Sequence, residues 1–383
     1  MSRNMNDEKC VDIIIPVYNA LNDLKKCLES IEKYTDLDKN KVIIINDNSS
    51  DPEVKPFLDL LDCRKFIIYH NKNNKGFSAN VNKGMSQSEN KDVILLNSDT
   101  IVTKNWIDKI LNCAYSSEAI GTVTPLSNNA TLCSVPLFCC ENFLPAYLNV
   151  DEAAEIVEKC SMKKYPRITV AHGFCMFIKR EVINKVGKFD SETFQKGYGE
   201  ENDFCNRAGQ MGYIHVMCDD TYIYHSGTKS FVSKEKEKLI REHEKILYDR
   251  YPIQMRQNEW YCQKNPDGYV AENVGLYFEL KNRKKNVLYM LHSDFRNGKE
   301  NNVGGTQFHV RDLKNGLSKE YNVFVVARNM QYLTVTGYVN QKEFEFDFYI
   351  GMADDYILDT SRQIRKALNI ILDAFSIDLV HVH

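Results

Sequence analysis

Residues 11–47, VDIIIPVYNALNDLKKCLESIEKYTDLDKNKVIIIND, contain a complete strand, helix and strand pattern. The segments VDIIIPVY (11–18) and KVIIIND (41–47) are β-branched apolar runs, which are typical of strands buried on both faces. Between them, leucine and isoleucine recur at helical spacing over 21–31, with polar residues in the remaining positions. The stretch therefore predicts a β-α-β unit.

The same alternation continues along the chain. FIIYHN (66–71), DVILLNSD (92–99) and IGTVTP (120–125) have strand patterns, and helical patterns begin at Gly76 and cover 105–116. This rhythm predicts a mostly parallel sheet with helices on both faces. Ligands bind such sheets at the carboxyl ends of the strands, so the polar strand ends PVYN, NDNSSD and NSDT should converge on one edge.

Composition excludes several classes of protein. The chain has 383 residues, enough for two or more domains, and its net charge of −3 gives no reason to expect a nucleic-acid partner. Twelve cysteines without a Cys-x-x-Cys pair fit a reducing cytosol. No apolar run approaches the ~20 residues of a membrane span. We therefore expect a cytoplasmic protein, whose association with the inner face of a membrane would be peripheral.

Beyond residue 125 the pattern changes. Residues 126–170 read as an insertion over the crevice, and a charged helix covers 233–252. From residue 287 a second strand, helix and strand pattern begins, and IDLVHVH (377–383) reads as another buried strand without its next helix. We expect the following division: a first domain at 8–252, a linker at 253–285 with a turn at 265–268, and a truncated second α/β domain at 286–383.

Two aspartates follow buried strands. Asp47, in NDNSSD, could accept a hydrogen bond from a nucleotide ring N–H or a ribose hydroxyl, although these residue types also form helix caps and Asx-turns. Asp99, in NSDT, could help to hold a phosphate-bound Mg²⁺ or Mn²⁺, which proteins usually bind through one or two carboxylates. It could equally cap the helix that follows.

The segment GYGEEND (197–203) crowds Glu200, Glu201 and Asp203 into the predicted first turn of a helix. There the helix dipole should keep the acids ionised. An ionised carboxylate aimed into a sugar-sized pocket is a suitable general base for a hydroxyl. Helix capping alone would need only one or two acids, so three acids behind Gly-x-Gly favour a functional role.

A further candidate lies in YIYHSGTKSF (222–231). His225 could be a ligand of a Mn²⁺-like ion, although a single histidine is more often a structural residue. Lys229, on the same loop, could neutralise phosphate or could simply be exposed.

In order along the chain, these segments resemble the family-two inverting glycosyltransferases of the GT-A fold, over about residues 11–231. The likeness is carried by IIIPVYNALNDLKKCLESI, VIIINDNSSD, NKGFSANVNKGM, VILLNSDTIV, GFCMFIKREV with VGKFD, GYGEENDFCNRAG and YIYHSGTKSF. It implies a Rossmann-like mixed sheet flanked by helices.

The resemblance also implies residue roles. Asp99 matches the last acid of the family's Asp-x-Asp metal motif, whose first position is Asn97 here, and His225 matches the histidine that completes the site for Mn²⁺ or Mg²⁺. Glu201 aligns with the base, Glu200 would contact acceptor or donor, and Asp203 is the fallback base. The nucleotide pocket would include Pro16, Val17, Tyr18, Asn19, Asp47, Asn80, Gly84, Ser98 and Lys229.

The implied activity is inverting transfer of a sugar from a UDP- or dTDP-sugar donor to a hydroxyl of a glycan or glycolipid acceptor, in surface polysaccharide or glycoconjugate synthesis. The 126–170 insertion would shape the acceptor site. Residues 287–383 resemble the beginning of a GT-B amino-terminal domain, through VGGTQFHVRDL and DLVHVH.

Two other functions remain open from the sequence. A catalytically degenerate nucleotide-sugar binding module is favoured by Asn97. A sugar nucleotidyltransferase should carry a glycine-rich basic loop after its first strand, and PVYNALNDL has none.

Overall fold

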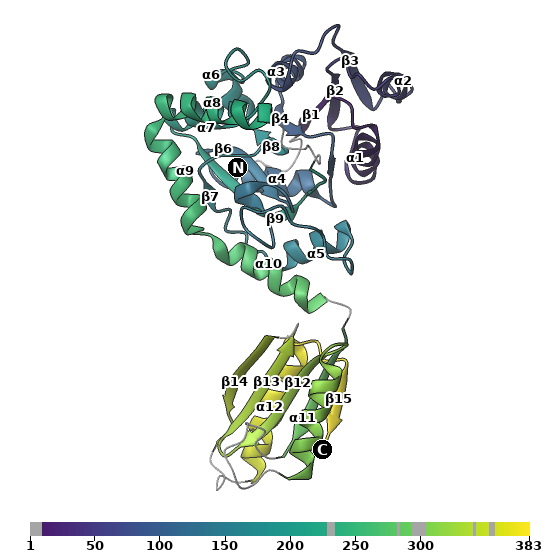
Figure 1. The fold of residues 1–383 in the computed structure, drawn as a ribbon, viewed down its shortest axis with the longest axis vertical. Helices are drawn as coiled ribbons and strands as arrows, with labels where there is room; N and C mark the ends of the chain where they lie inside the picture. The colour runs from purple at the N-terminus through teal and green to yellow at the C-terminus, as the bar shows by residue number, and fades with distance from the viewer. Residues whose placement is uncertain (1–9, 228–233, 282–283, 293–303, 340–341, 352–356) are drawn as a thin grey trace, which may run out of the picture. The chain divides into compact units, whose positions relative to one another are not determined.

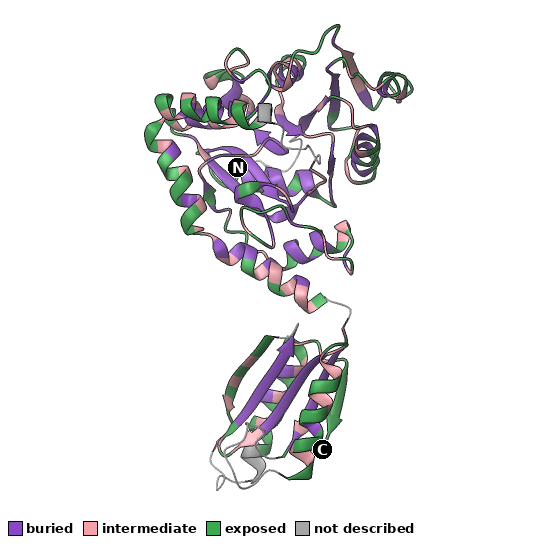
Figure 2. Ribbon diagram, viewed as in Figure 1, coloured by how far each residue is buried: buried purple, intermediate pink, exposed green. Residues whose placement is uncertain are grey.

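The computed structural model describes residues 10–227, 234–281, 284–292, 304–339, 342–351 and 357–383 (Figure 1). The chain divides into two compact units, Met1–Tyr277 and Phe278–His383, each with its own sheet. Buried residues concentrate in the central strands of both sheets, whereas the outer helices and the edge strands β14 and β15 carry many exposed residues (Figure 2).

The first unit is built on an eight-stranded mixed sheet with the strand order β3-β2-β1-β4-β8-β6-β9-β7. Strands β3, β2, β1 and β4 are parallel, and β8 and β7 run antiparallel to their neighbours. The mixed α/β sheet predicted from the sequence is therefore confirmed. The strands are β1 (Val11–Val17), β2 (Lys41–Asn46), β3 (Phe66–His70), β4 (Asp92–Leu96), β6 (Ile120–Leu126), β7 (Arg167–Ile168), β8 (Cys175–Ile178) and β9 (Ile214–Tyr222).

Amphipathic helices flank this sheet. In the first of them Leu24, Leu28 and Ile31 are buried, as their spacing predicts. Within the described ranges, no helix combines the length and the apolarity that a membrane span requires. The helices before the charged one are α1 (Leu21–Tyr34), α2 (Val54–Asp59), α3 (Phe77–Gln87), α4 (Trp106–Ala114), η1 (Thr131–Cys133), α5 (Val150–Cys160), α6 (Arg180–Val186) and α7 (Glu200–Gln210).

A separate two-stranded ladder joins distant parts of the first unit. Strand β5 (Thr100–Ile101) pairs antiparallel with β10 (Tyr224–His225), so that Thr100 lies opposite His225. The main-chain N–H of Ser226 also donates to the carbonyl of Asp99 at 2.9 Å. The ladder therefore places Asp99 beside His225, although 126 positions separate them in the chain.

The region predicted to be a linker is helical. The charged helix α8 (Lys234–Arg250) ends before Pro252, as expected, but Pro252 then occupies the first turn of α9 (Pro252–Lys264). The predicted turn at 265–268 connects α9 to α10 (Gly268–Lys281). Met255 of α9 packs with Leu247 and Phe194, which ties this helix to the first unit. The boundary between the units falls after Tyr277, inside the segment 253–285 that was predicted to be the linker.

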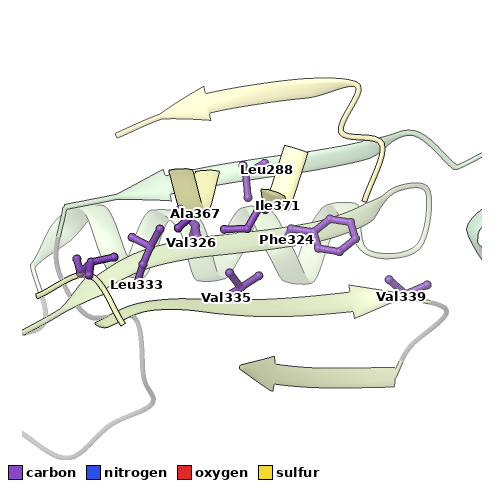
Figure 3. Close-up of a cluster of buried hydrophobic side chains, with 9 residues drawn as sticks. Leu288, Phe324, Val326, Leu333, Val335, Val339, Ala367 and Ile371 are labelled. Carbon is purple, nitrogen blue, oxygen red and sulfur yellow. The ribbon is translucent and has the colours of Figure 1, made fainter. Parts of the chain in front are cut away.

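The second unit is a five-stranded sheet in the order β14-β13-β12-β11-β15. Strands β12, β11 and β15 are parallel, and β12, β13 and β14 form an antiparallel meander. Alternate residues of β11 face opposite layers: Val287 packs with α11, and Leu288 packs in the α12 layer shown in Figure 3. Its elements are β11 (Asn286–Leu291), α11 (Gly305–Leu317), β12 (Asn322–Asn329), β13 (Tyr332–Val339), β14 (Lys342–Tyr349), α12 (Ile357–Ala374) and β15 (Leu379–Val382).

The last strand corrects one expectation. We predicted that 377–383 would be a buried strand, but all four residues of β15 are exposed, with Val382 at 69%. Within the described part of the chain β15 pairs with β11 alone, and none of its residues belongs to the hydrophobic cluster on either face of the sheet. An apolar run alone does not distinguish an edge strand from a central one.

The contact between α3 and β1 predicts the effect of one substitution. A Cβ added at Gly84 would lie 2.3 Å from the Cγ2 of Ile14, so Gly84→Ala should destabilise the first unit by about 1–3 kcal/mol through overpacking. Tryptophan fluorescence during urea unfolding would measure this, because both tryptophans, Trp106 and Trp260, belong to the first unit. The matched control is Gly209→Ala in α7, where the nearest atom is 3.8 Å away and no loss is expected. Equal stabilities of the two variants would contradict the packing argument.

Candidate active site

A cavity of about 650 Å³ opens at the carboxyl edge of the first sheet. The ends of β1, β2 and β4 contribute Tyr18, Asp47 and Asp99, which confirms that the polar strand ends converge. The rest of the lining comes from the start of α3, from Gly173 two residues before β8, and from the start of α7 with the residues just before it. The lining residues are Pro16, Val17, Tyr18, Ala20, Asp47, Asn74, Gly76, Phe77, Asn80, Asn97, Ser98, Asp99, Gly173, Lys196, Gly197, Tyr198, Glu200 and Glu201.

Glu201 enters the cavity from the first turn of α7 and is held by a main-chain donor. The N–H of Gly173 donates to Oε1 of Glu201 at 2.8 Å. A Cβ at residue 173 would lie 2.3 Å from that same oxygen, so only glycine allows the carboxylate to approach the backbone so closely. Burial raises the pKa of Glu201 to about 7, and the Gly173 hydrogen bond only partly opposes it.

Glu200 is more deeply buried than its neighbour. It is 2% exposed, and its Oε2 has no hydrogen-bond partner within the described structure. Burial and the negative charge of Glu201 together raise the pKa of Glu200 well above its usual range. A buried acceptor without a partner in a ligand-sized cavity is a position where a hydroxyl or another donor would be stabilised.

These two acids correct the expectation that the helix dipole keeps them ionised. They do lie in the first turn of α7, where the dipole favours negative charge. Burial acts in the opposite direction, because it disfavours the charged form of both acids and raises their pKa values. It is the larger effect here, and the charge of Glu201 raises the pKa of Glu200 further. Both acids that line the cavity therefore have raised pKa values, where the dipole alone would lower them.

Asp203, the fallback base, is not part of the cavity lining. Its two carboxylate oxygens accept from Arg207 at 2.8 Å, from Arg250 at 3.1 Å and from the hydroxyl of Tyr251 at 2.8 Å. It is only 1% exposed. The ion pairs of Asp203 connect α7 to the end of α8. We therefore no longer expect Asp203 to be the base.

Asp47 lines the cavity, but its oxygens are already engaged. They accept from the main-chain N–H groups of Lys75 and Gly76 and from the amide of Asn71, at 2.7 to 3.1 Å. The carboxylate therefore fastens the loop before α3 to the end of β2. This is the turn-forming role that the residue pattern also allowed, and it leaves little acceptor capacity for a nucleotide.

Asp99 and His225 form a pair beside the cavity. The Nε2 of His225 lies 3.3 Å from Oδ1 of Asp99, and the Nδ1 of His225 lies 2.8 Å from the carbonyl oxygen of Asn129. Because a carbonyl can only accept, Nδ1 carries the hydrogen. Burial opposes the charged imidazolium, but the hydrogen bond to Asp99 and its negative charge outweigh burial and raise the pKa of His225.

This geometry fits a divalent cation. With Nδ1 protonated, a neutral His225 points the lone pair of Nε2 at a carboxylate oxygen, an arrangement that needs either a proton or a metal ion between the two acceptors. An N–H to carbonyl bond on the second ring nitrogen is the usual support of a metal-bound histidine. Over the described residues no cluster of three or more His, Cys, Asp or Glu side chains could hold a metal, so the protein would supply two ligands.

The backbone of His225 is held from a neighbouring loop. The side chain of Asn128 accepts from the His225 N–H at 2.8 Å and donates to its carbonyl at 2.9 Å, and the ring of Phe174 stacks on the imidazole at a centroid distance of 5.3 Å. Asn128 belongs to the 126–170 insertion, so the insertion holds the main chain of His225. None of its described residues lines the cavity, so the prediction that it shapes an acceptor site gains no support from the lining.

The remaining predicted pocket residues divide into three groups. Pro16, Val17, Tyr18, Asn80 and Ser98 line the cavity. Asn19 is outside it and bonds to Ser49, Ser50 and Asp51, and Gly84 packs on Ile14 instead of facing a nucleotide. Lys229 lies outside the described residues.

Sequence reasoning missed Gly173, Lys196 and Tyr198. Lys196 is the one cationic side chain in the lining, counted over the described residues. Both Lys196 and Tyr198 belong to QKGYG, immediately before the predicted acids, and the two glycines there were the available signal. Gly173 appeared only as the first residue of the motif GFCMFIKREV.

Part of the first unit matches a known protein family. Residues 12–187 match the family described as Glycosyl transferase family 2. The chain is 25% identical over 167 residues to Glycosyltransferase GlyA of Streptococcus pneumoniae, covering 43% of this chain and 24% of that protein. It is 23% identical over 216 residues to Probable glycosyltransferase YdaM of Bacillus subtilis, covering 55% and 49%. The chain thus spans half or less of the length of these relatives.

Solved structures with a similar arrangement include the mannosyltransferase PcManGT of Pyrobaculum calidifontis in complex with GDP-Man and Mn²⁺. Its TM-score is 0.46 at 13% identity, over 81% of this chain and 80% of that one. GalNAc-T7 with UDP, GalNAc and Mn²⁺ also has a TM-score of 0.46, at 14% identity, over 68% and 55%.

The Asp203 anchor predicts a difference between neighbouring acids. Asp203→Asn should destabilise the first unit by roughly 2–3 kcal/mol, because it leaves Arg207 and Arg250 without their shared carboxylate. Glu201→Gln is the control. The pKa of Glu201 is raised, so its ionisation costs stability as the pH rises from 4.5 to about 7, and removing the charge should be neutral or stabilising at pH 8. Urea unfolding at pH 8 measures both, and a larger loss in the Glu201 variant would overturn the assignment.

Proposed function

From the premise that residues 12–187 form a glycosyl transferase family 2 domain, we propose that this chain transfers a sugar, with inversion, from a nucleotide-diphosphate sugar to a hydroxyl group. The observation that carries the proposal is the cavity itself. It gathers an acid with a pKa of about 7, an aspartate paired with a histidine and, among the described residues, one lysine, from segments far apart in the chain. The donor is a UDP- or dTDP-sugar, and the acceptor is a glycan or glycolipid.

Glu201 is the proposed base. A base works best when its pKa lies near the operating pH, and burial has brought Glu201 to that range. It takes the proton from the acceptor hydroxyl while that oxygen attacks the anomeric carbon. The bond from the anomeric carbon to the diphosphate oxygen breaks on the opposite face. Holding donor and acceptor in one cavity removes much of the entropic cost of bringing two substrates together.

Glu200 and Lys196 have supporting roles in this proposal. The unpartnered Oε2 of Glu200 accepts a hydrogen bond from a sugar hydroxyl. Lys196 contributes a positive charge for the diphosphate in a lining that otherwise carries four acids. When bound, a Mn²⁺ or Mg²⁺ ion held by Asp99 and His225 would offset the charge of the leaving diphosphate.

Asn97 favours a second candidate, a binding module without catalytic activity. It lines the cavity next to Ser98 and Asp99, where the resembled family carries an acid. A neutral amide weakens the metal site, because the protein then offers only one carboxylate there. Such a module would bind nucleotide sugars and neither hydrolyse nor transfer them.

The base assignment gives the first test. Glu201→Gln should lower donor hydrolysis or transfer by about 10²–10⁴-fold, because the amide cannot accept the proton. In the native protein kcat/KM should rise with pH and level off above about 7, since only the ionised carboxylate is a base. Release of UDP or dTDP from a panel of donors, with Mn²⁺ present, measures both. Glu192→Gln, an exposed acid outside the cavity lining, is the control.

Two outcomes would count against this function. Undiminished turnover in Glu201→Gln would remove Glu201 as the base. Nucleotide binding without any turnover in the native protein would favour the binding module.

The charge of the cavity gives the second test. UDP or dTDP with Mn²⁺ should raise the melting temperature, because ligands that bind only the folded state stabilise it. Lys196→Met should weaken nucleotide binding on the order of tenfold, a loss of about 1.4 kcal/mol. Lys72→Met, an exposed lysine outside the lining, should leave binding unchanged. Equal affinities for the two variants would show that Lys196 does not contact the phosphates.

A further inference from the structure

One wall of the cavity is a segment whose conformation is costly. We call residues 190–199 the wall segment, and it ends in Gly197, Tyr198 and Gly199, with φ values of 88°, 67° and 143°. Glycine adopts such angles readily, but for tyrosine the left-handed region is unfavourable. Tyr198 therefore keeps its positive φ only if neighbouring groups hold the segment in place.

Helix α8 supplies those groups through His243. Its Nδ1 lies 3.0 Å from the carbonyl oxygens of both Gly197 and Tyr198. Carbonyl oxygens only accept hydrogen bonds, so Nδ1 carries a hydrogen and donates to both. His243 is 6% exposed, and its ring meets that of Phe194 edge-on, with centroids 5.0 Å apart.

The wall segment determines what the cavity presents to a ligand. Lys196 and Tyr198 line the cavity from it. Gly199, its last residue, is the N-cap of α7, so the same backbone sets where Glu200 and Glu201 begin. A change in the angles of Gly197 or Tyr198 would thus move the cavity lysine and both acids together.

The opposite end of the wall segment is held independently. Arg250, at the end of α8, donates to Asp190 at 2.9 Å and to the hydroxyl of Thr193 at 3.0 Å. Ser78 of α3 donates to the carbonyl of Phe194 at 2.5 Å. Because these bonds do not involve residue 243, a substitution there acts on the part of the segment that faces the cavity.

We propose that His243 is a positioning residue of this site: through its two hydrogen bonds it holds Gly197 and Tyr198 in the left-handed conformation that directs Lys196, Glu200 and Glu201 into the cavity. Its effect on sugar transfer rests on the proposed function, whereas its effect on the wall segment does not. His243 lies outside the cavity lining and acts through the backbone.

Three variants of His243 distinguish the position of the hydrogen-bond donor from the size and polarity of the side chain. Asparagine places an amide N–H close to where Nδ1 of histidine lies, so His243→Asn keeps a donor. Glutamine carries the same amide one methylene farther out, so His243→Gln is similarly polar but misplaces the donor. His243→Ala removes it. Glu244→Ala, at the next position of α8 and exposed, is the matched control.

Limited trypsin digestion of the full chain measures how firmly the wall segment is held, because trypsin cleaves after lysine and Lys196 is exposed and precedes a glycine. We expect cleavage after Lys196, followed by mass spectrometry, to be about tenfold faster in the Ala and Gln variants. The Asn variant and the Glu244→Ala control should be cut at close to the native rate. Native-like cleavage of His243→Ala, or equal behaviour of the Asn and Gln variants, would overturn the proposal.

Kinetics provide the second readout. With donor varied, the KM of the Ala and Gln variants should rise about five- to tenfold, with a smaller fall in kcat, and the Asn variant should recover most of the loss. A variant that merely unfolds would lose kcat through a smaller active fraction at unchanged KM, and that result would contradict a positioning role. If the native protein transfers no sugar, the proposed function fails, while the proteolysis result still decides the role of His243.

Discussion

The parallel pairing of β1 between β2 and β4 is the constraint on which the site depends. Val17 lies opposite Asn46, and the N–H of Asp47 donates to the carbonyl of Val17, so the two strands end together. Strand β4 pairs with the other side of β1 in the same direction. Segments that are distant in sequence therefore reach one edge of the sheet. The cavity, the buried acids Glu200 and Glu201, and the β5–β10 ladder that carries His225 all lie around that edge.

The strand ends and the closeness of Asp99 to His225 could be predicted because they follow from apolar runs and from the order of motifs. The partners of Asp203 could not. They include Arg250, which is 47 positions away on a helix whose sequence indicates only a solvated face. No local pattern in GYGEEND indicates that Asp203 meets Arg250 while Glu200 and Glu201 line the cavity. For the same reason Lys196 was visible only as part of a glycine-containing turn, and β15 could not be recognised as an exposed edge strand.

Electrostatics in this protein are decided by burial more than by secondary structure. The first turn of α7 favours negative charge, and sequence reasoning stopped at that rule. Removal of Glu200 and Glu201 from water instead raises the pKa values of both, and the negative charge of Glu201 raises the pKa of Glu200 further. Asp203, in the same turn, is also buried, but it is paired with two arginines. One helical turn thus holds two acids that line the cavity and one that joins α7 to α8 through ion pairs.

The double hydrogen bond from Asn128 to the main chain of His225 has a consequence for how ordered this part of the molecule is before any ligand arrives. Both backbone groups of the histidine are satisfied by one side chain, so the main chain at residue 225 is fixed to the loop that carries Asn128. The conformational entropy of this segment is therefore lost during folding, and a ligand that contacts His225 would not have to order the backbone on binding.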